Sequence, residues 1–396
     1  MIDLHPLRKL SRPREAIRQF TPNWFTLNMG TGILFLMLAQ FPFFVFGLAP
    51  LTRILFWADI GFYLLFCGMF IGRWVFFTRG ALRLLDHPVQ SMFLGAIPMG
   101  LAPIINGAVN FYGGTPFAVH TALILWFTDA ALSLFIGWLV PFYMFTRQSH
   151  AFENMTGVWL LPIVPAEVAA VSAGTIAPHL PVQTAQMVTI IGYALWAISV
   201  PLAFGILAIL FLRLALHKLP HRDMAVSTWL ALGPIGTGST ALILLGNSSV
   251  RAFAGEKFFH MLAMAQGIGL IGGLFLWGLG LWWFGMAALI TLRYVKDGLP
   301  FNMGWWGFTF PLGVYTASTF AIFAETKFAF FELFGAGLVV LLAFFWVVVT
   351  TRTMQGMWSG QLFSAPCLTG ECLSGETGLP MFDPVPVVAS NELRVQ

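Results

Sequence analysis

Three acidic residues lie inside long uncharged stretches, and they are the first side chains that could do chemistry. Glu167 lies in WLLPIVPAEVAA, and Asp59 and Asp129 lie in two other apolar runs. An ionised carboxylate at the centre of a bilayer costs about 2.5–3.5 kcal/mol on insertion scales. We therefore expect Glu167 to be protonated or hydrogen-bonded, paired with a cation, or a proton-coupling group. Asp59 and Asp129 are interpreted as structural.

Hydroxyl groups are the second chemical feature, and they gather in stretches that Gly and Pro interrupt. No Lys or Arg lies inside those stretches to clamp a carboxylate. Such hydroxyls, with the backbone N–H groups of bent helices, could pass an anion by weak hydrogen bonding at several sites. The alternative is hydrogen bonding between helices, worth roughly 0.6 kcal/mol each. The hydroxyl residues are Thr31, Ser172, Thr175, Thr237, Ser239, Thr240, Thr309, Thr316, Ser318 and Thr319.

Motifs of enzymes and of metal or cofactor sites are missing from the sequence. It contains no HExxH, P-loop, GxSxG or CxxCH pattern, so we expect no catalytic residues, no metal and no cofactor. Cys67, Cys367 and Cys372 give no disulfide framework. Cys367 and Cys372 lie five residues apart in APCLTGECLSGETG, a weak metal or redox hint, and we interpret them as spare thiols.

Composition indicates the elements that must position these groups. Hydrophobic residues make up 58% of the chain and charged residues only 9%, against roughly 25% charged in soluble proteins. Uncharged runs of about 20 residues recur, and each can span the hydrocarbon core as a helix. The chain is therefore an all-α integral membrane protein in a lipid bilayer. Its net charge of +4 is too small to suggest a nucleic-acid partner.

Hydropathy predicts ten transmembrane helices between two polar ends. A basic N-terminal segment at 1–24 precedes a ten-helix transmembrane domain at 25–352, and a flexible tail follows at 353–396. The predicted helices are 25–47, 51–77, 89–111, 118–146, 156–176, 185–216, 224–246, 260–294, 303–325 and 330–352.

The distribution of basic residues predicts the orientation. The N-terminal segment and the zones following even-numbered helices hold sixteen Lys and Arg, and the zones following odd-numbered helices hold four. Basic residues favour the cytoplasmic side. Both termini are therefore expected in the cytoplasm, with the protein in the plasma (inner) membrane.

The odd-numbered helices are interrupted and the even-numbered ones are smoother. Six prolines lie within odd helices and two within even ones, and a tryptophan precedes the break in four odd helices. This pattern predicts a helical hairpin repeated five times. Irregular backbone at membrane depth persists only where it is buried in protein or lines a water-filled cavity. The odd helices are therefore expected to line a central pore, although kinked helices that merely pack better are an alternative.

Glycines and prolines at these breaks are the candidate pore-lining or helix-kinking residues. They are Gly30, Gly32, Pro98, Gly100, Pro165, Pro234, Gly236, Gly238, Pro311 and Gly313.

Four motifs together resemble those of a known family. They are NWFTLNMGTGI (23–33), HPVQSMFLGAIPMGLAPIIN (87–106), LGPIGTGS (232–239) and GWWGFTFPLG (304–313). Over residues 20–352 the chain resembles the tellurite-resistance/dicarboxylate transporter (TDT) family. This family includes bacterial TehA, plant slow anion channels, fungal malate permeases and fungal sulfite efflux pumps.

The resemblance implies an architecture and a gate. It implies ten helices in five hairpins, an inner ring of odd helices, and a homotrimer with one pore in each protomer. It also implies an occluding phenylalanine on the ninth helix, and Phe310 in FTFP is the residue that matches. Gly30 matches a first-helix glycine of the family, where a side chain would crowd the pore.

The resemblance leaves the substrate open between two anions. PMGLAPIIN and GPIGTGS are most similar to the sulfite efflux pump, whereas NWFTLNMGTGI is equally similar to the malate permease. The absence of basic pore residues favours a small, weakly bound oxyanion over tight dicarboxylate recognition. A broad small-anion channel for chloride or nitrate is an alternative, and so is a non-conducting membrane scaffold or sensor.

Overall fold

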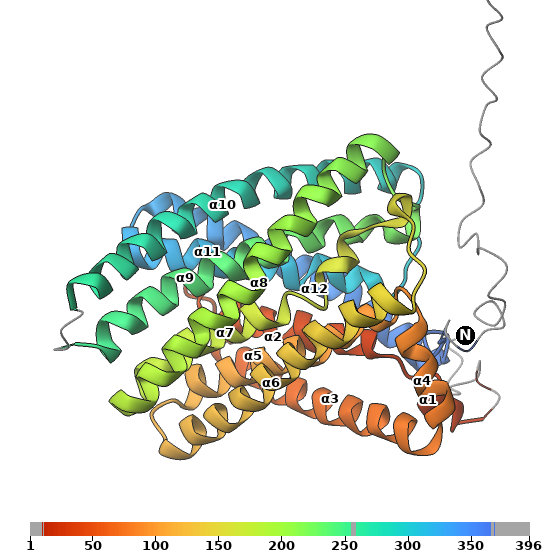
Figure 1. Cartoon of the computed structure of the whole chain (residues 1–396), viewed down its shortest axis with the longest axis horizontal. Helices are drawn as coiled ribbons and strands as arrows, with labels where there is room; N and C mark the ends of the chain where they lie inside the picture. The colour runs from red at the N-terminus through yellow and green to blue at the C-terminus, as the bar shows by residue number, and fades with distance from the viewer. Residues whose placement is uncertain (1–9, 11, 255–258, 366–367, 369–396) are drawn as a thin grey trace, which may run out of the picture.

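The computed structural model describes residues 10, 12–254, 259–365 and 368, and this part of the chain is helical (Figure 1). Its first half contains α1 (Glu15–Arg18), η1 (Pro22–Trp24), α2 (Phe25–Ala39), α3 (Leu48–Phe76), α4 (Thr78–Asp86), η2 (Ser91–Gly95), α5 (Ala96–Tyr112), α6 (Pro116–Thr146), η3 (Phe152–Asn154), η4 (Gly157–Leu160) and α7 (Pro165–Ile176). The second half contains η5 (Ala177–His179), α8 (Val182–His217), η6 (Arg222–Ala231), α9 (Leu232–Ala252), α10 (Phe259–Lys296), η7 (Met303–Phe308), α11 (Phe310–Thr326) and α12 (Ala329–Ser359). The η elements are short 3-10 helices.

Eight helical stretches of the described chain are long and apolar enough to cross a membrane. This confirms an all-helical, multi-pass membrane protein. The helices α2 and α7 are shorter, with 15 and 12 residues, and are not among the eight. The candidate spans are Leu48–Phe76, Ser91–Tyr112, Pro116–Thr146, Val182–His217, Arg222–Ala252, Met264–Lys296, Met303–Thr326 and Ala329–Ser359.

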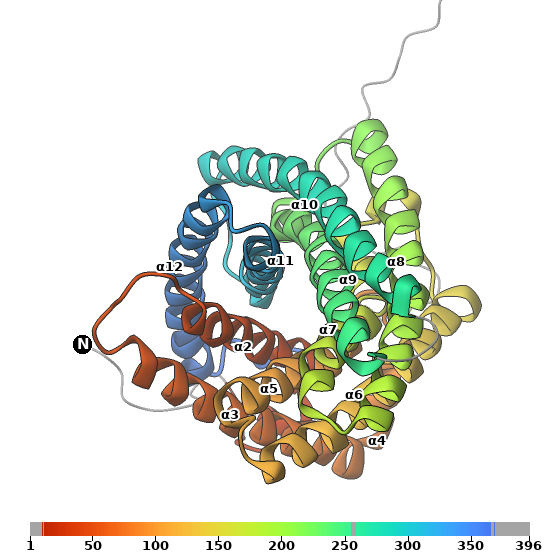
Figure 2. The same ribbon diagram turned by 90° about the vertical axis from the view of Figure 1, so that its left-hand side faces the viewer.

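The long helices separate into a buried set and an exposed set. The most apolar windows of the stretches containing α5 and α9 are 83% buried, and that of α11 is 72% buried. The corresponding windows of α3, α6, α8, α10 and α12 are only 22–33% buried. Nearly every residue of α2 and α7 is buried as well. Figure 2 shows α11 enclosed by α9, α10 and α12. We call α2, α5, α7, α9 and α11 the inner helices, and α3, α6, α8, α10 and α12 the outer helices.

A 3-10 segment leads into each inner helix of the described chain, and prolines lie where the helix type changes. Pro165 is the first residue of α7, and Pro311 is the second residue of α11. Pro98 and Pro234 lie in the first turns of α5 and α9. Proline is tolerated in a first turn because the N–H that it lacks has no intrahelical partner there. The expected interruptions are therefore helix starts, whereas Pro103 lies inside α5.

Tryptophans of the 3-10 segments connect inner helices to outer ones. Trp229 in η6 donates from Nε1 to Thr291 Oγ1 of α10 at 2.8 Å. Trp306 in η7 donates from Nε1 to Thr353 Oγ1 of α12 at 3.1 Å. Both indole rings are fully buried, so each bond satisfies an N–H that would be costly to leave unpaired.

Several helix ends differ from the sequence prediction. The short helix α4 was not expected at all. The helix α2 ends at Ala39 rather than at 47, ahead of Pro42, which cannot continue a helical hydrogen-bond ladder. The helix α12 continues to Ser359 rather than ending at 352, and the backbone N–H of Ala365 donates to Gln19 Oε1 at 2.9 Å. Cys367 and Cys372 lie outside the described residues.

Candidate anion pathway

The middle and later turns of α2, α5 and α7, the middle of α9 and much of α11 line a cavity of about 620 Å³. We call it the helix-end cavity. Residues of all five inner helices line it, and most are apolar. No charged side chain of the described chain lies in its wall. Its polar lining residues are Gln40, Asn106, Asn110, Thr175, Thr237 and Thr240.

A second cavity of about 390 Å³ lies on the side where the 3-10 segments enter the inner helices. We call it the 3-10-side cavity. Asp223 is the one carboxylate in its described lining, and no Lys or Arg lines it. Its polar lining residues are Asn23, Thr26, His87, Gln90, Asp223, Ser227 and Asn302.

Phe310 is the one described residue that lines both cavities. It is the first residue of α11, directly before Pro311, and it is 96% buried. The preceding turn is held locally, because Thr309 donates from Oγ1 to the Trp306 carbonyl at 2.7 Å and accepts at its own carbonyl from Gly313 N–H at 2.9 Å. Phe310 therefore borders both the cavity on the 3-10 side and the cavity beside the later turns of α2, α5 and α7.

The predicted glycine positions lie at close contacts between helices, and neither cavity includes them in its lining. A Cβ added at Gly30 would lie 2.3 Å from Thr309 Oγ1. A Cβ at Gly313 would lie 2.4 Å from Ile33 Cγ1, and one at Gly236 would lie 2.6 Å from the Tyr315 backbone nitrogen. These glycines bring α2 and α9 close to α11, so a side chain at Gly30 would collide with protein atoms.

The remaining predicted positions behave in the same way. A Cβ at Gly32 would lie 2.3 Å from Pro103 Cβ, one at Gly100 would lie 3.2 Å from Asn28 Cβ, and one at Gly238 would lie 3.3 Å from Val200 Cγ2. Pro98, Pro165 and Pro234 mark helix starts away from both cavities, and Pro311 lines the 3-10-side cavity beside Phe310.

Glu167 is fully buried behind the wall of the helix-end cavity. Thr237, which lines that cavity, has its Oγ1 2.8 Å from Glu167 Oε1 and 2.7 Å from the Gly233 carbonyl oxygen. A hydroxyl has one proton to donate and can also accept. If Thr237 donates to Gly233, a protonated Glu167 can donate to Thr237, and both contacts are satisfied. The other carboxyl oxygen of Glu167 has no hydrogen-bond partner among the described residues.

The two other buried carboxyl groups lie on outer helices. Asn28 donates from Nδ2 to Asp59 Oδ1 at 3.0 Å and to the Asp59 carbonyl at 2.9 Å, which links α2 to α3. Neither side-chain oxygen of Asp129 has a partner among the described residues. Neither residue lines either of the two described cavities.

Most of the hydroxyl groups noted in the sequence bond to protein atoms of the helices. Ser318 donates to Ser239 Oγ at 2.6 Å, and Ser239 donates to the Gly273 carbonyl at 2.9 Å. Only Thr175, Thr237 and Thr240 of that set line a described cavity. Five of the ten contact a residue of another helix, namely Thr31, Thr237, Ser239, Ser318 and Thr319, and the other five bond to a carbonyl of their own helical segment.

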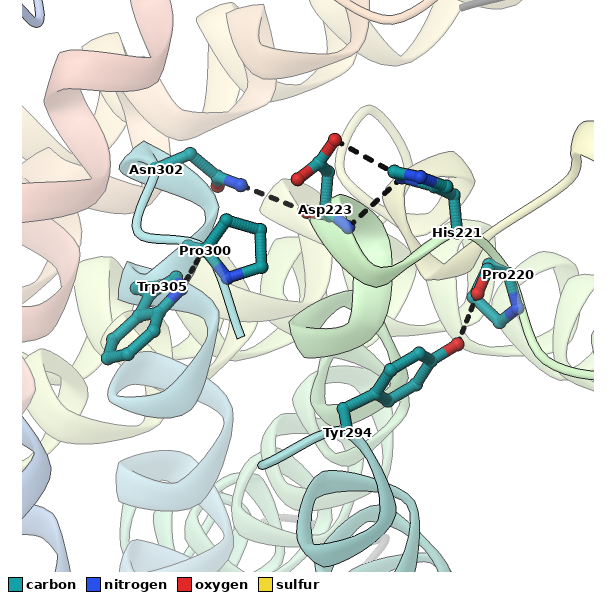
Figure 3. A network of polar contacts seen from close by, with 7 residues as sticks. All are labelled: Pro220, His221, Asp223, Tyr294, Pro300, Asn302 and Trp305. Carbon is teal, nitrogen blue, oxygen red and sulfur yellow. Dashed lines mark hydrogen bonds and ion pairs between the residues drawn. The ribbon is translucent and has the colours of Figure 1, made fainter. Parts of the chain in front are cut away.

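The polar wall of the 3-10-side cavity was missed by the sequence analysis. His87 and Asn23 are the first residues of two of the quoted motifs, which was the available signal. Figure 3 shows Asp223 between His221 and Asn302. Asn302 Nδ2 donates to the Asp223 carbonyl at 3.0 Å, and the Asp223 carboxylate lies 3.1 Å from His221 Nδ1. These residues join the loop before η6 to the loop before η7.

Metal binding finds no support in the described residues. No group of three or more His, Cys, Asp and Glu side chains lies close enough there to hold a metal ion.

Comparisons with known proteins show which sequences this chain resembles. The family described as SLAC1, voltage-dependent anion channel, matches residues 19–354. A sulfite efflux pump of Trichophyton rubrum is 38% identical over 357 residues, which cover 88% of this chain and 93% of the relative. An uncharacterized transporter of Methanocaldococcus jannaschii is 33% identical over 355 residues, covering 88% and 96%. The malic acid transport protein of Schizosaccharomyces pombe is 22% identical over 343 residues, covering 85% and 78%.

The family match extends over most of the chain and includes all four quoted motifs. It confirms the resemblance drawn from those motifs and excludes the enzyme classes. The chain therefore belongs to the voltage-dependent anion channel family of membrane anion transporters and channels.

Proposed function

We propose that this protein moves sulfite across the membrane through a pore that joins the two cavities and is closed by Phe310. One observation carries the proposal: among the described residues, Phe310 alone borders both cavities. A rotation of this side chain, or a small shift of α11 at Pro311, would connect them.

The proposed pore has ten spans arranged as five hairpins, each with one inner and one outer helix. The helices α2 and α7 are the two spans that fall below the usual length. Their preceding segments η1 and η4 extend them, and their burial means that they need no contact with lipid. On this view residues 25–352 hold the transport domain, with a basic segment at 1–24 and a tail at 353–396.

Sulfite is preferred as the substrate for two reasons. Relatives named as sulfite efflux pumps are 38% identical to this chain, against 22% for the malic acid transport protein. Neither cavity offers a described Lys or Arg that could pair with a carboxylate, and arginine is the usual bidentate partner of carboxylates. Malate is the second candidate, favoured by the similarity to the malic acid transport protein.

The proposed setting is the plasma membrane, with both termini in the cytoplasm. The excess of Lys and Arg at the N-terminus and after the outer helices supports it. The 3-10-side cavity would then open toward the cytoplasm, because it is lined by the segments that enter the inner helices.

A homotrimer with one pore in each protomer is part of the proposal. It rests on the family resemblance and fits the apolar outer helices, where Trp57, Trp138 and Trp282 are exposed. Light scattering of the purified protein, corrected for detergent, would give the mass. A monomeric mass would contradict this part alone.

The test of the gate is a flux assay on protein reconstituted in liposomes. We expect Phe310→Ala to raise sulfite flux at least about tenfold, because about 1.4 kcal/mol of barrier corresponds to that factor. Phe308→Ala is the matched control, since Phe308 is also buried but stacks on Phe345 at 4.8 Å and lines neither cavity.

The order of permeating anions then separates the candidates. Sulfite ahead of malate and chloride supports the proposal, and chloride or nitrate first supports a broad anion channel. If Phe310→Ala passes none of these anions, the proposal of a pore is wrong, and the alternative of a non-conducting scaffold or sensor replaces it.

Proton coupling through Glu167 is an additional proposal, supported by its contact with the cavity residue Thr237. We expect Glu167→Gln to keep the fold, because an amide can also donate to Thr237, and to abolish any pH dependence of flux seen in the wild type. Thr237→Val, which removes the contact, should also abolish it. Unchanged pH dependence in both variants would leave Glu167 with a structural role.

A further inference from the structure

Two segments that lie against each other form one wall of the 3-10-side cavity. One is η1, which contains Asn23, and the other contains His87 and Gln90 and leads into η2. All three side chains line the cavity. His87 is 95% buried and Gln90 is 92% buried, so the cavity is the one space that both side chains are known to face.

The hydrogen bonds of His87 determine which ring nitrogen carries the proton. Its Nδ1 accepts from the backbone N–H of Val89 at 3.1 Å and of Gln90 at 3.2 Å. In a neutral imidazole the other nitrogen is then the donor. No described residue accepts a hydrogen bond from Nε2, and that N–H is left for an occupant of the cavity.

Burial keeps this ring neutral. Loss of solvation lowers the pKa of His87 from 6.5 to about 4. The ring is therefore an uncharged donor throughout the ordinary cytoplasmic pH range.

The two amide side chains are oriented in a similar way. Thr21 donates from Oγ1 to Asn23 Oδ1, so the Nδ2 group of Asn23 is the end that remains available. Gln90 has no side-chain hydrogen bond to any described residue, and its Oε1 is buried without a partner. The Nε2 group of Gln90 is therefore the donor left for an anion, whereas the buried Oε1 is an acceptor that an anion cannot satisfy.

The other polar groups around this cavity are already used. Thr26 donates to the Asn23 carbonyl at 2.5 Å, and Ser227 donates to the Met224 carbonyl at 2.6 Å. Asn302 accepts from Gly304 N–H at 2.8 Å and donates to the Asp223 carbonyl. The Asp223 carboxylate lies beside His221 and would repel an anion placed near it.

We propose that Asn23, His87 and Gln90 form a binding site for a compact oxyanion such as sulfite, held by uncharged N–H donors next to Phe310. This deepens the proposed function and rests on it for the identity of the anion. Three neutral donors hold an anion without the tight pairing of an Arg or Lys. Such moderate binding is what a pathway needs, because the solute must leave as well as enter.

His87→Asn is the decisive variant, because it separates the two roles of the ring. The Asn Oδ1 can accept the two backbone N–H groups as an Asx turn does, so the local fold is kept. The Asn side chain is shorter, so its own Nδ2 donor does not reach the position of the ring Nε2–H. His217→Asn makes the same change at an exposed position outside both cavities and is the matched control.

The first readout is sulfite binding to the full-length protein in detergent. A ligand that binds only the folded state raises the melting temperature with increasing concentration. We expect His87→Asn to need at least about tenfold more sodium sulfite for the same stabilisation, because hydrogen bonds to charged groups are among the stronger ones. Gln90→Glu, which replaces a donor by an acceptor, should weaken binding further, and His217→Asn should match the wild type. Sodium chloride at equal ionic strength controls for salt.

Equal sulfite stabilisation of the wild type and His87→Asn would overturn the site, and so would a lack of sulfite stabilisation in both. The second readout is sulfite flux in the Phe310→Ala background, where His87→Asn should raise the half-saturating concentration about tenfold. If Phe310→Ala conducts and His87→Asn leaves that concentration unchanged, the site fails while the proposed function stands. If Phe310→Ala does not conduct but binding still depends on His87, the proposed function fails and the site stands.

Discussion

Several glycines of the inner helices pack against a neighbouring element and several glycines of the outer helices do not, although Gly280 of α10 and Gly335 of α12 are packed as closely as the inner ones. A Cβ added at Gly30, Gly236 or Gly313 of the inner helices would lie 2.3–2.6 Å from atoms of a neighbouring element. A Cβ added at Gly61, Gly205 or Gly285 of the outer helices would meet no atom within 4 Å. The same residue type therefore serves close helix approach inside the bundle and has no packing role at those outer positions.

The difference shows that the closely packed glycines allow neighbouring helices to approach. Small residues allow backbones to approach closely in a membrane, where no hydrophobic force draws helices together. Close approach at Gly236 and Gly313 places α9 and α2 against the start of α11. Phe310 is the first residue of that helix, so the packed glycines determine where the ring lies without touching either cavity.

The largest effect that would test this comparison is expected from Gly236→Ala. The new Cβ would lie 2.6 Å from Tyr315 N and 2.7 Å from Val314 C, which are backbone atoms of α11. Backbone cannot move aside as a flexible side chain can, and overpacking costs roughly 1–3 kcal/mol or more. We expect a clear drop in the melting temperature of the detergent-purified protein. An unchanged melting temperature would mean that α9 and α11 are not in this contact.

A smaller loss of stability is expected at low pH, through His87 in the wall of the 3-10-side cavity. Burial lowers the pKa of His87 in the folded protein to about 4, below the value of about 6.5 for an unfolded chain. As pH falls, the unfolded chain binds the proton first. The stabilising contribution of neutral His87 is therefore complete above about pH 6.5 and is lost as pH falls toward 4.

Melting temperatures measured from pH 7 to pH 4.5 test this expectation. The slope from this one group is at most about 1.4 kcal/mol per pH unit. His87→Asn should flatten the acid-side decline, and the exposed-site control His217→Asn should leave it as in the wild type. Identical declines in the wild type and His87→Asn would exclude a buried neutral ring.

The smallest effect is expected from Gly285→Ala in the outer helix α10. The added methyl meets no atom within 4 Å, and alanine favours a helix over glycine by about 0.5–1 kcal/mol. We expect a melting temperature equal to or slightly above that of the wild type. A loss as large as that of Gly236→Ala would erase the distinction between the packed glycine position and the unpacked one.

Particular residues show how far the sequence could predict the fold. The prolines and tryptophans of the interrupted stretches marked the inner helices. A helix tolerates Pro in its first turn because the backbone N–H there has no intrahelical partner. Helix ends were less predictable. Hydropathy did not mark the end of α2 at Ala39, the short helix α4 or the continuation of α12 to Ser359, since these depend on neighbouring packing.

The candidate site divides in the same way. Phe310 was identified by its motif, and the structure gives it a position between two cavities. The glycines were expected at the pore wall. Because glycine has no side chain, its sequence position does not indicate whether it faces a cavity or a neighbouring helix. The polar wall of Asn23, His87 and Gln90 was missed, because residues 64 positions apart become neighbours only when η1 packs against η2.

The amino-acid sequence by itself determined that this protein lies in a lipid bilayer, that it is helical, to which family it belongs and which residue is the candidate gate. Those properties follow from hydropathy and local residue order, which act along the chain. Only the tertiary structure decided which faces of the inner helices touch protein and which leave space. That choice depends on contacts between helices distant in sequence, and such contacts carry no local signature.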